Sequence, residues 1–172
     1  GATKYSVNVN SVSFSQDSRM LATGSWYQGA KIWDIYNEKE LASLDESYNV
    51  LKVLFSSQGS LLATANEFQK DKGTQYSLKV WDLGNISCPQ SAKELMVINS
   101  LNAIDEIAFS PDGRYLAASF IDRRSNNLTV SVWDIATFKE AILESDYDLY
   151  TSTISPDGKY VAASSWRGTP LT

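Results

Sequence analysis

The residues that most enzymes use for acid–base and nucleophilic chemistry are scarce in this chain. Its 172 residues include no histidine and a single cysteine, Cys88. A Ser-His-Asp or Cys-His arrangement needs an imidazole to take the proton from the nucleophile, so both arrangements are excluded. Zinc sites draw most of their ligands from cysteine and histidine, so the same counts disfavour zinc.

Other short segments resemble ligand or modification motifs without completing them. The stretch GSWYQGAK (24–31) resembles a phosphate loop, but Ala30 stands where the lysine should be, and the segment joins two expected strands. The acidic segment ESDYD (144–148) lacks the glycine and the distal glutamate of a calcium loop, which favours a solvated connection. The sequons at 85–87 and 127–129 follow no secretory signal. We therefore expect no metal, no cofactor and no enzyme activity.

Composition and charge narrow the classes of partner. The hydrophobic fraction is 43% and the charged fraction 20%, as in a globular protein about one domain long. The formal net charge is −5 and the isoelectric point about 4.7, which argues against nucleic acid and an anionic membrane as partners. No apolar run approaches the roughly 18 residues of a membrane span. One cysteine cannot form an intrachain disulfide, and we expect a cytoplasmic protein.

The clearest signal in the chain is an internal repeat. The stretch AFSPDGRYLAAS (108–119) returns almost intact as TISPDGKYVAAS (153–164), and weaker copies occupy 12–25 and 53–66. In each copy a strand-forming segment leads into a turn; Pro-Asp-Gly in the last two fixes φ at one position and permits positive φ at another. A second strand follows, with small residues at its centre. Each copy therefore predicts a β-hairpin whose small residues let a neighbouring sheet approach closely.

Two further strands are expected after each of the first three hairpins. The third strands alternate apolar and polar residues, as half-buried strands do, and each contains a Trp-Asp dipeptide. These third strands are expected at 30–35, 78–83 and 130–135, and weaker fourth strands at 40–46, 93–100 and 139–145. The repeated unit is thus four antiparallel strands.

The Trp-Asp dipeptides, in register with the hairpins, resemble the WD-repeat family from about residue 8 to residue 166. The resemblance implies an all-β fold, a β-propeller of four-stranded antiparallel blades. It also implies a structural role for the residues of the three dipeptides, which are Trp33, Asp34, Trp81, Asp82, Trp133 and Asp134. Because the chain has no histidine, the family's Asp-His-Ser/Thr-Trp hydrogen-bond network cannot form. Thr23 with Trp33, and Thr64 with Trp81, would retain one bond of it.

The number of repeats is incomplete for a closed ring. We expect a single propeller region over 1–172, with blades at 3–46 (including an N-terminal strand at 3–7), 47–101 and 102–146, and an incomplete fourth blade at 147–172. Propellers close with four to eight blades, and closure removes exposed faces and edges. Either the chain is a piece of a longer propeller, or copies associate to complete a ring.

The expected function is non-enzymatic binding of a protein or peptide partner, which includes a second copy, through the connections between second and third strands. Those at 66–76 and 120–127 are expected to be long loops on one face of the propeller. Aromatic residues and arginine are enriched at interface hot spots. The candidate partner-binding residues are Trp26, Tyr27, Phe68, Lys70, Lys72, Arg123, Arg124, Trp166 and Arg167. The alternative is a propeller that holds or gates a small ligand for a catalytic domain outside this chain.

Overall fold

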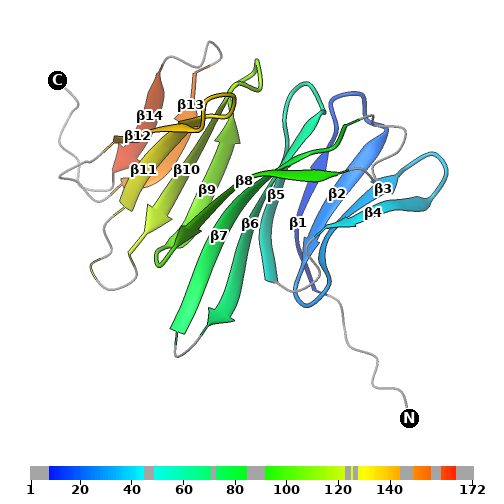
Figure 1. The fold of residues 1–172 in the computed structure, drawn as a ribbon, viewed down its shortest axis with the longest axis horizontal. Helices are drawn as coiled ribbons and strands as arrows, with labels where there is room; N and C mark the ends of the chain where they lie inside the picture. The colour runs from blue at the N-terminus through cyan, green and yellow to red at the C-terminus, as the bar shows by residue number, and fades with distance from the viewer. Residues whose placement is uncertain are drawn as a thin grey trace.

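The protein is an all-β molecule of side-by-side antiparallel sheets, as the sequence predicts (Figure 1). The computed structural model describes residues 8–44, 49–70, 73–84, 92–122, 125, 128–143, 149–155 and 160–165. Within these residues, three four-stranded sheets and one two-stranded sheet follow one another in chain order, and no helix occurs. This arrangement is a partial β-propeller, with each four-stranded sheet as one blade.

The strands of each blade are paired in the order in which they occur in the chain. The first blade comprises β1 (Val9–Phe14), β2 (Met20–Ser25), β3 (Gly29–Asp34) and β4 (Lys39–Leu44). The second comprises β5 (Asn49–Phe55), β6 (Leu61–Lys70), β7 (Gly73–Asp82) and β8 (Lys93–Ser100). The third comprises β9 (Ala103–Phe109), β10 (Tyr115–Ile121), β11 (Leu128–Asp134) and β12 (Lys139–Leu143), and β13 (Leu149–Ile154) pairs with β14 (Val161–Ser165). The strand expected at 3–7 lies outside the described residues.

Neighbouring blades pack face to face, and the small residues of the second strands make this possible. In the first blade, Gly24 lies so close to the second blade that an added Cβ would stand 2.6 Å from Cγ1 of Val50. The apolar first strand β5 therefore packs directly against the face formed by β1, β2 and β3. This contact buries ten hydrophobic residues: Met20, Ala22, Ala30, Ile32, Leu44, Val50, Val53, Phe55, Leu62 and Leu83.

The contact between the second and third blades repeats the same plan. The face of β6, β7 and β8 supplies Ala63, Leu78 and Met96, and the third blade supplies the first-strand residues Ile104 and Ile107. Buried aliphatic side chains of this size each contribute about 1.5–3 kcal/mol. The sequence repeat therefore produces the same interface twice: the first strand of the second blade packs against the first blade, and the first strand of the third blade packs against the second.

The three Trp-Asp dipeptides end the third strands β3, β7 and β11. The indole N–H of Trp33 donates to Oγ1 of Thr23 at 3.0 Å, and that of Trp81 donates to Oγ1 of Thr64 at 3.1 Å. Both of the bonds expected from the sequence are therefore present. Trp133 is buried, and its ring meets the edge of Phe120 at a centroid distance of 6.0 Å. Trp33 and Trp81 are half-buried.

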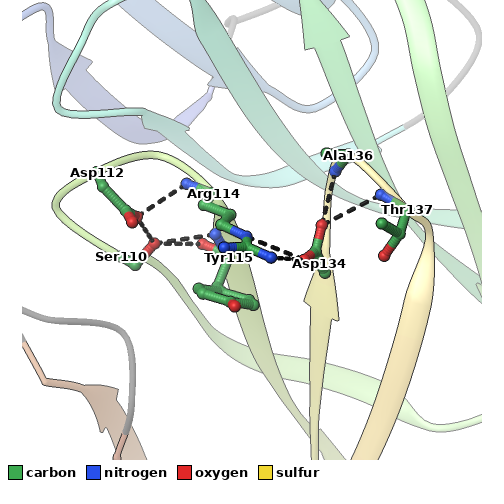
Figure 2. Close-up of polar contacts among 7 residues, drawn as sticks. All are labelled: Ser110, Asp112, Arg114, Tyr115, Asp134, Ala136 and Thr137. Carbon is green, nitrogen blue, oxygen red and sulfur yellow. Dashed lines mark hydrogen bonds and ion pairs between the residues drawn. The ribbon is translucent and has the colours of Figure 1, made fainter.

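The tight turn of the third blade shows why its sequence repeats (Figure 2). The hydroxyl of Ser110 donates to Asp112 at 2.6 Å and accepts the amide of Tyr115 at 2.9 Å, while the amide of Arg114 donates to Asp112 at 3.0 Å. The hydroxyl of Ser110 and, secondly, the amide of Arg114 lower the pKa of Asp112. Gly113 adopts φ 70°, a conformation that glycine reaches at no steric cost. The turn is thus specified residue by residue.

The same turn is tied to the Trp-Asp dipeptide of its own blade. Nε and Nη2 of Arg114 both donate to Oδ2 of Asp134, at 3.0 and 2.9 Å (Figure 2). Oδ1 of Asp134 accepts the amides of Ala136 and Thr137 at 3.0 and 3.1 Å. Burial opposes ionisation of Asp134, but these donors outweigh it and lower the pKa of the carboxyl. The dipeptide aspartate therefore caps the turn between β11 and β12.

Candidate functional site

The turns between second and third strands lie together at one end of the blades, at the lower side of Figure 1. Four of the nine candidate partner-binding residues fall within the described residues of this face: Trp26 and Tyr27 between β2 and β3, and Phe68 and Lys70 at the end of β6. Lys72, Arg123, Arg124, Trp166 and Arg167 lie outside the described residues, and their role stays a prediction. The opposite end carries the turns that involve Ser110 and Asp134.

Trp26 and Tyr27 form an aromatic pair at the tip of the first blade. Their rings meet edge to face, with centroids 5.9 Å apart and planes at 86°. The amide of Trp26 donates to the carbonyl of Asn8 at 3.0 Å, which fixes the base of the turn. Tyr27 is 75% exposed, although its backbone is in the left-handed region at φ 71°. That backbone conformation costs a non-glycine residue of order 1–3 kcal/mol. Tyr27 therefore exposes its ring on a backbone conformation that tyrosine does not favour.

A shallow hollow lies beside this pair. It has a volume of about 260 Å³ and is lined by Tyr27, Gln28, Lys31 and Ser43. Nζ of Lys31 lies 2.8 Å from Oε2 of Glu40 and 5.8 Å from the centre of the Trp33 ring. The ammonium group is therefore already held by a carboxylate and a ring face. Sequence reasoning did not select Lys31 or Ser43, because only the pairing of β3 with β4 places them together beside Tyr27.

The second blade carries the most extended element of this face. The sequence predicts a loop over 66–76, but the structure corrects this: β6 and β7 stay paired from Leu61–Asp82 to Lys70–Gly73. In the first blade the equivalent pairing ends at Ser25–Gly29, so the β6–β7 hairpin continues for four more residue pairs. The hairpin therefore projects beyond the first blade, as Figure 1 shows.

Cross-strand contacts explain why this segment is a hairpin. Nε2 of Gln69 donates to Oγ1 of Thr74 at 3.0 Å across the strands. At its base, Asn66 is fully buried, and its amide nitrogen lies 3.3–3.4 Å from oxygen atoms of Thr64 and Ser77. Polar residues paired across strands stabilise a hairpin although their composition resembles that of a loop. The segment expected as a loop at 120–127 also begins in strand, since β10 continues through Ile121.

A second hollow lies along the first strands β1, β5 and β9. It has a volume of about 300 Å³ and is lined by Asn10, Ser11, Leu51, Lys52, Val53, Leu54, Glu106 and Ile107. Nζ of Lys52 lies 2.6 Å from Oε1 of Glu106, so the two charges compensate each other. Burial raises the pKa of nearby Asp105; Lys52 opposes this shift and Glu106 adds to it.

The described part of the chain contains neither a cluster of metal-binding side chains nor a helix that could span a membrane. No group of three or more histidine, cysteine, aspartate or glutamate side chains there is placed to hold a metal ion. None of the elements described is a helix long and apolar enough to cross a membrane. The candidate calcium segment at 144–148 and the sequon residues 85–87 lie outside the described residues.

Comparison with known proteins gives two kinds of similarity. The family model described as "WD domain, G-beta repeat" matches residues 3–34 and 96–134. Small ribosomal subunit protein RACK1z of Oryza sativa subsp. japonica is 28% identical over 135 residues, which are 77% of this chain and 36% of that protein. Human WD repeat and SOCS box-containing protein 1 is 34% identical over 107 residues, 61% of this chain and 23% of that protein.

A solved structure shows the same fold. The β-propeller domain of Cps50 (Swd1) from Myceliophteria thermophila superposes with a TM-score of 0.74 at 16% identity. The match covers 94% of this chain and 51% of that domain. The chain thus spans about half of that propeller domain, and less than two fifths of the curated relatives above.

Proposed function

The chain is a WD-repeat protein with the fold of a partial β-propeller, and on this premise we propose that it is a non-enzymatic interaction module. In this role it acts as a scaffold, and the ends of its second and third strands contact a protein or peptide partner. The proposal includes a reducing, cytoplasmic environment, since the single Cys88 allows no intrachain disulfide.

The observation that carries the proposal is the exposed aromatic pair at the tip of the first blade. The ring of Tyr27 is 75% exposed on a left-handed backbone, next to the exposed ring of Trp26. Ser18, Glu38 and Phe138 adopt the same backbone region in other turns, so it is the exposed rings and not the backbone that support the proposal. Tyrosine and tryptophan supply large contact areas at low entropic cost, which is why interfaces are rich in them.

The β6–β7 hairpin extends the same face beyond the plane of the first blade. Lys70 is exposed near its end, and Phe68 is half-buried two residues earlier. The hairpin projects beside the aromatic pair, so the surface has two levels. Such a surface can bind a folded domain, or a peptide that places an apolar side chain against the aromatic rings. The remaining candidates, Lys72, Arg123, Arg124, Trp166 and Arg167, belong to this proposal on sequence position alone.

The test is comparative capture with two matched tyrosine variants. Tyr27→Asn removes the ring but keeps a residue that tolerates positive φ. Tyr36→Asn is the control, because Tyr36 is 74% exposed in the turn between β3 and β4, away from Tyr27. The immobilised wild type and both variants are incubated with lysate of the source organism, and bound proteins are quantified by mass spectrometry.

We expect at least one protein to be captured by the wild type and by Tyr36→Asn and lost from Tyr27→Asn. The unfolding free energy of Tyr27→Asn should stay within about 1 kcal/mol of wild type, because relief of strain offsets the lost contact with Trp26. A Tyr27→Asn chain that retains every captured protein contradicts the proposed face. A second variant, Lys70→Glu, should weaken the same capture.

A further inference from the structure

The outer strand of each four-stranded blade carries a glutamate directly opposite the tryptophan of the Trp-Asp dipeptide. In the strand register, Trp33 pairs with Glu40, Trp81 with Glu94, and Trp133 with Glu140. The three glutamates are therefore equivalent positions of the repeat, and their surroundings can be compared directly.

In the first two blades a lysine neutralises this glutamate. Nζ of Lys79 lies 3.1 Å from Oε2 of Glu94 and 5.4 Å from the centre of the Trp81 ring. Lys31 makes the same ion pair with Glu40 at 2.8 Å. Each lysine stands two residues before the tryptophan, on the same face of the strand. The cation thus belongs to the repeat as much as the glutamate does.

The third blade keeps the glutamate but lacks the lysine. Ser131 takes its place, since Ala118 pairs with Ser131 as Thr64 pairs with Lys79. A serine carries no charge, so nothing at this position neutralises the carboxylate of Glu140.

No other described side chain replaces the missing cation. Glu140 is exposed, and within the described ranges no lysine or arginine lies within ion-pair distance of its carboxylate. Lys139 comes directly before it in β12, and successive side chains of a strand point to opposite faces. Glu140 is therefore an acceptor whose equivalents in the other two blades are both occupied.

A hollow of about 360 Å³ lies at this carboxylate, where the second and third blades meet. Its lining residues are Leu95, Met96, Val97 and Ile98 of β8, and Trp133, Phe138 and Glu140 of the third blade. Leu95, Val97 and Phe138 are 37%, 40% and 55% exposed, whereas Met96 and Trp133 are buried. The hollow thus has an apolar rim and a single acidic group.

We propose that this hollow binds a peptide segment of a partner protein, in which a basic residue is adjacent to apolar residues. The basic side chain pairs with Glu140, as Lys79 does with Glu94 within the second blade. Its apolar neighbours pack against the exposed rim of Leu95, Val97 and Phe138. Charge complementarity selects this occupant, and the formal net charge of −5 favours encounter with a basic segment.

This site is separate from the face that carries Trp26 and Tyr27. Phe138 and Glu140 lie in and just after the turn between β11 and β12, at the opposite end of the blades, and β8 and β12 are outer strands. The inference therefore does not depend on the proposed function, and a variant at Glu140 leaves the aromatic pair intact.

The test begins with a selection of random heptapeptides, displayed on phage, on the immobilised full chain. The recovered peptides are synthesised, and their dissociation constants are measured by fluorescence polarisation with the wild type and three variants. Glu140→Gln removes the charge of the hollow. Glu40→Gln is the matched control, because it is the equivalent glutamate of the first blade and already pairs with Lys31. Ser131→Lys supplies the missing lysine within the chain.

We expect recovered peptides with a basic residue beside apolar ones. They should bind Glu140→Gln about fivefold more weakly than the wild type, the upper range for an exposed ion pair, and Glu40→Gln unchanged. Ser131→Lys should weaken the same peptides at least as much, because its ammonium group would pair with Glu140. Circular dichroism checks that each variant is folded, and Glu140→Gln alone decides the outcome if Ser131→Lys is not.

Glutamine in place of the basic residue of the peptide completes a double-mutant cycle. It should weaken binding to the wild type and add no further loss with Glu140→Gln, since both changes remove the same ion pair. A selection without any peptide that is weakened by Glu140→Gln overturns the proposal. Equal losses with Glu140→Gln and Glu40→Gln overturn it as well, as do additive losses in the cycle.

Discussion

The substitution Gly24→Ala tests the close contact between the first two blades. A Cβ at this position would lie 2.6 Å from Cγ1 of Val50 and 3.0 Å from Cγ1 of Val53. The first distance is about 0.8 Å shorter than the 3.4 Å at which ordinary van der Waals contact begins. Both methyl groups sit on β-branched side chains whose χ1 is restricted, so the blades must separate or a rotamer must change.

Overpacking of this kind costs about 1–3 kcal/mol. Replacing glycine by alanine elsewhere stabilises a protein by about 0.4–1 kcal/mol, because the unfolded chain loses conformational freedom. Gly73 supplies the matched control, since a Cβ there meets no atom within 4 Å and its backbone is outside the left-handed region. Gly24→Ala should therefore be destabilised and Gly73→Ala neutral or slightly stabilised.

The assay is urea unfolding followed by tryptophan fluorescence, with the double variant Gly24→Ala/Val50→Ala completing a cycle. Val50→Ala removes the clashing methyl group, so the double variant should be more stable than the sum of the two single effects predicts. A Gly24→Ala chain as stable as Gly73→Ala would refute the argument that small residues set the distance between blades.

Three further substitutions test contacts inside the blades. Thr64→Val removes the acceptor of the Trp81 indole N–H, and we expect a loss of about 1–3 kcal/mol in urea unfolding; an unchanged midpoint would count against this bond. Asp112→Asn should destabilise the chain at pH 7, and the difference should vanish as pH falls below 3.8 through the lowered folded-state pKa, where Ser110 no longer faces a carboxylate; a pH-independent difference would contradict this. Phe120→Ala should cost about 3–5 kcal/mol in the same assay, and a loss below 1 kcal/mol would show that the ring is not part of the core.

Local chemistry explains why the sequence predicted four-stranded antiparallel sheets. The hydroxyl and carboxylate of Ser110 and Asp112, with Gly113 at positive φ, define a turn within five residues. The Trp-Asp ends of β3, β7 and β11 follow from strand alternation and from the aspartate that caps the next turn. These turns and strand ends depend on residues that are close together in the chain, so they can be predicted from the sequence pattern.

The features that the sequence did not predict depend on pairing across strands. The polar residues from Glu67 to Gln75 look like a loop by composition, and only the register with β7 makes them a hairpin. The positive φ of Tyr27 has no signal in its residue type, because tyrosine rarely adopts that conformation. Likewise, Val12 and Val53 occupy equivalent positions in the repeat, and only the arrangement of blades decides which is exposed.

The most direct test of the central claim, that this face binds a protein partner, is a hydrogen-exchange footprint of the chain with and without a captured partner. The account predicts slower amide exchange in the β2–β3 turn at Trp26–Gly29 and in the β6–β7 hairpin, with the turn at Ser110–Arg114 on the opposite end unchanged. Protection confined to that opposite turn, or to the outer strands β4 and β8, would contradict it.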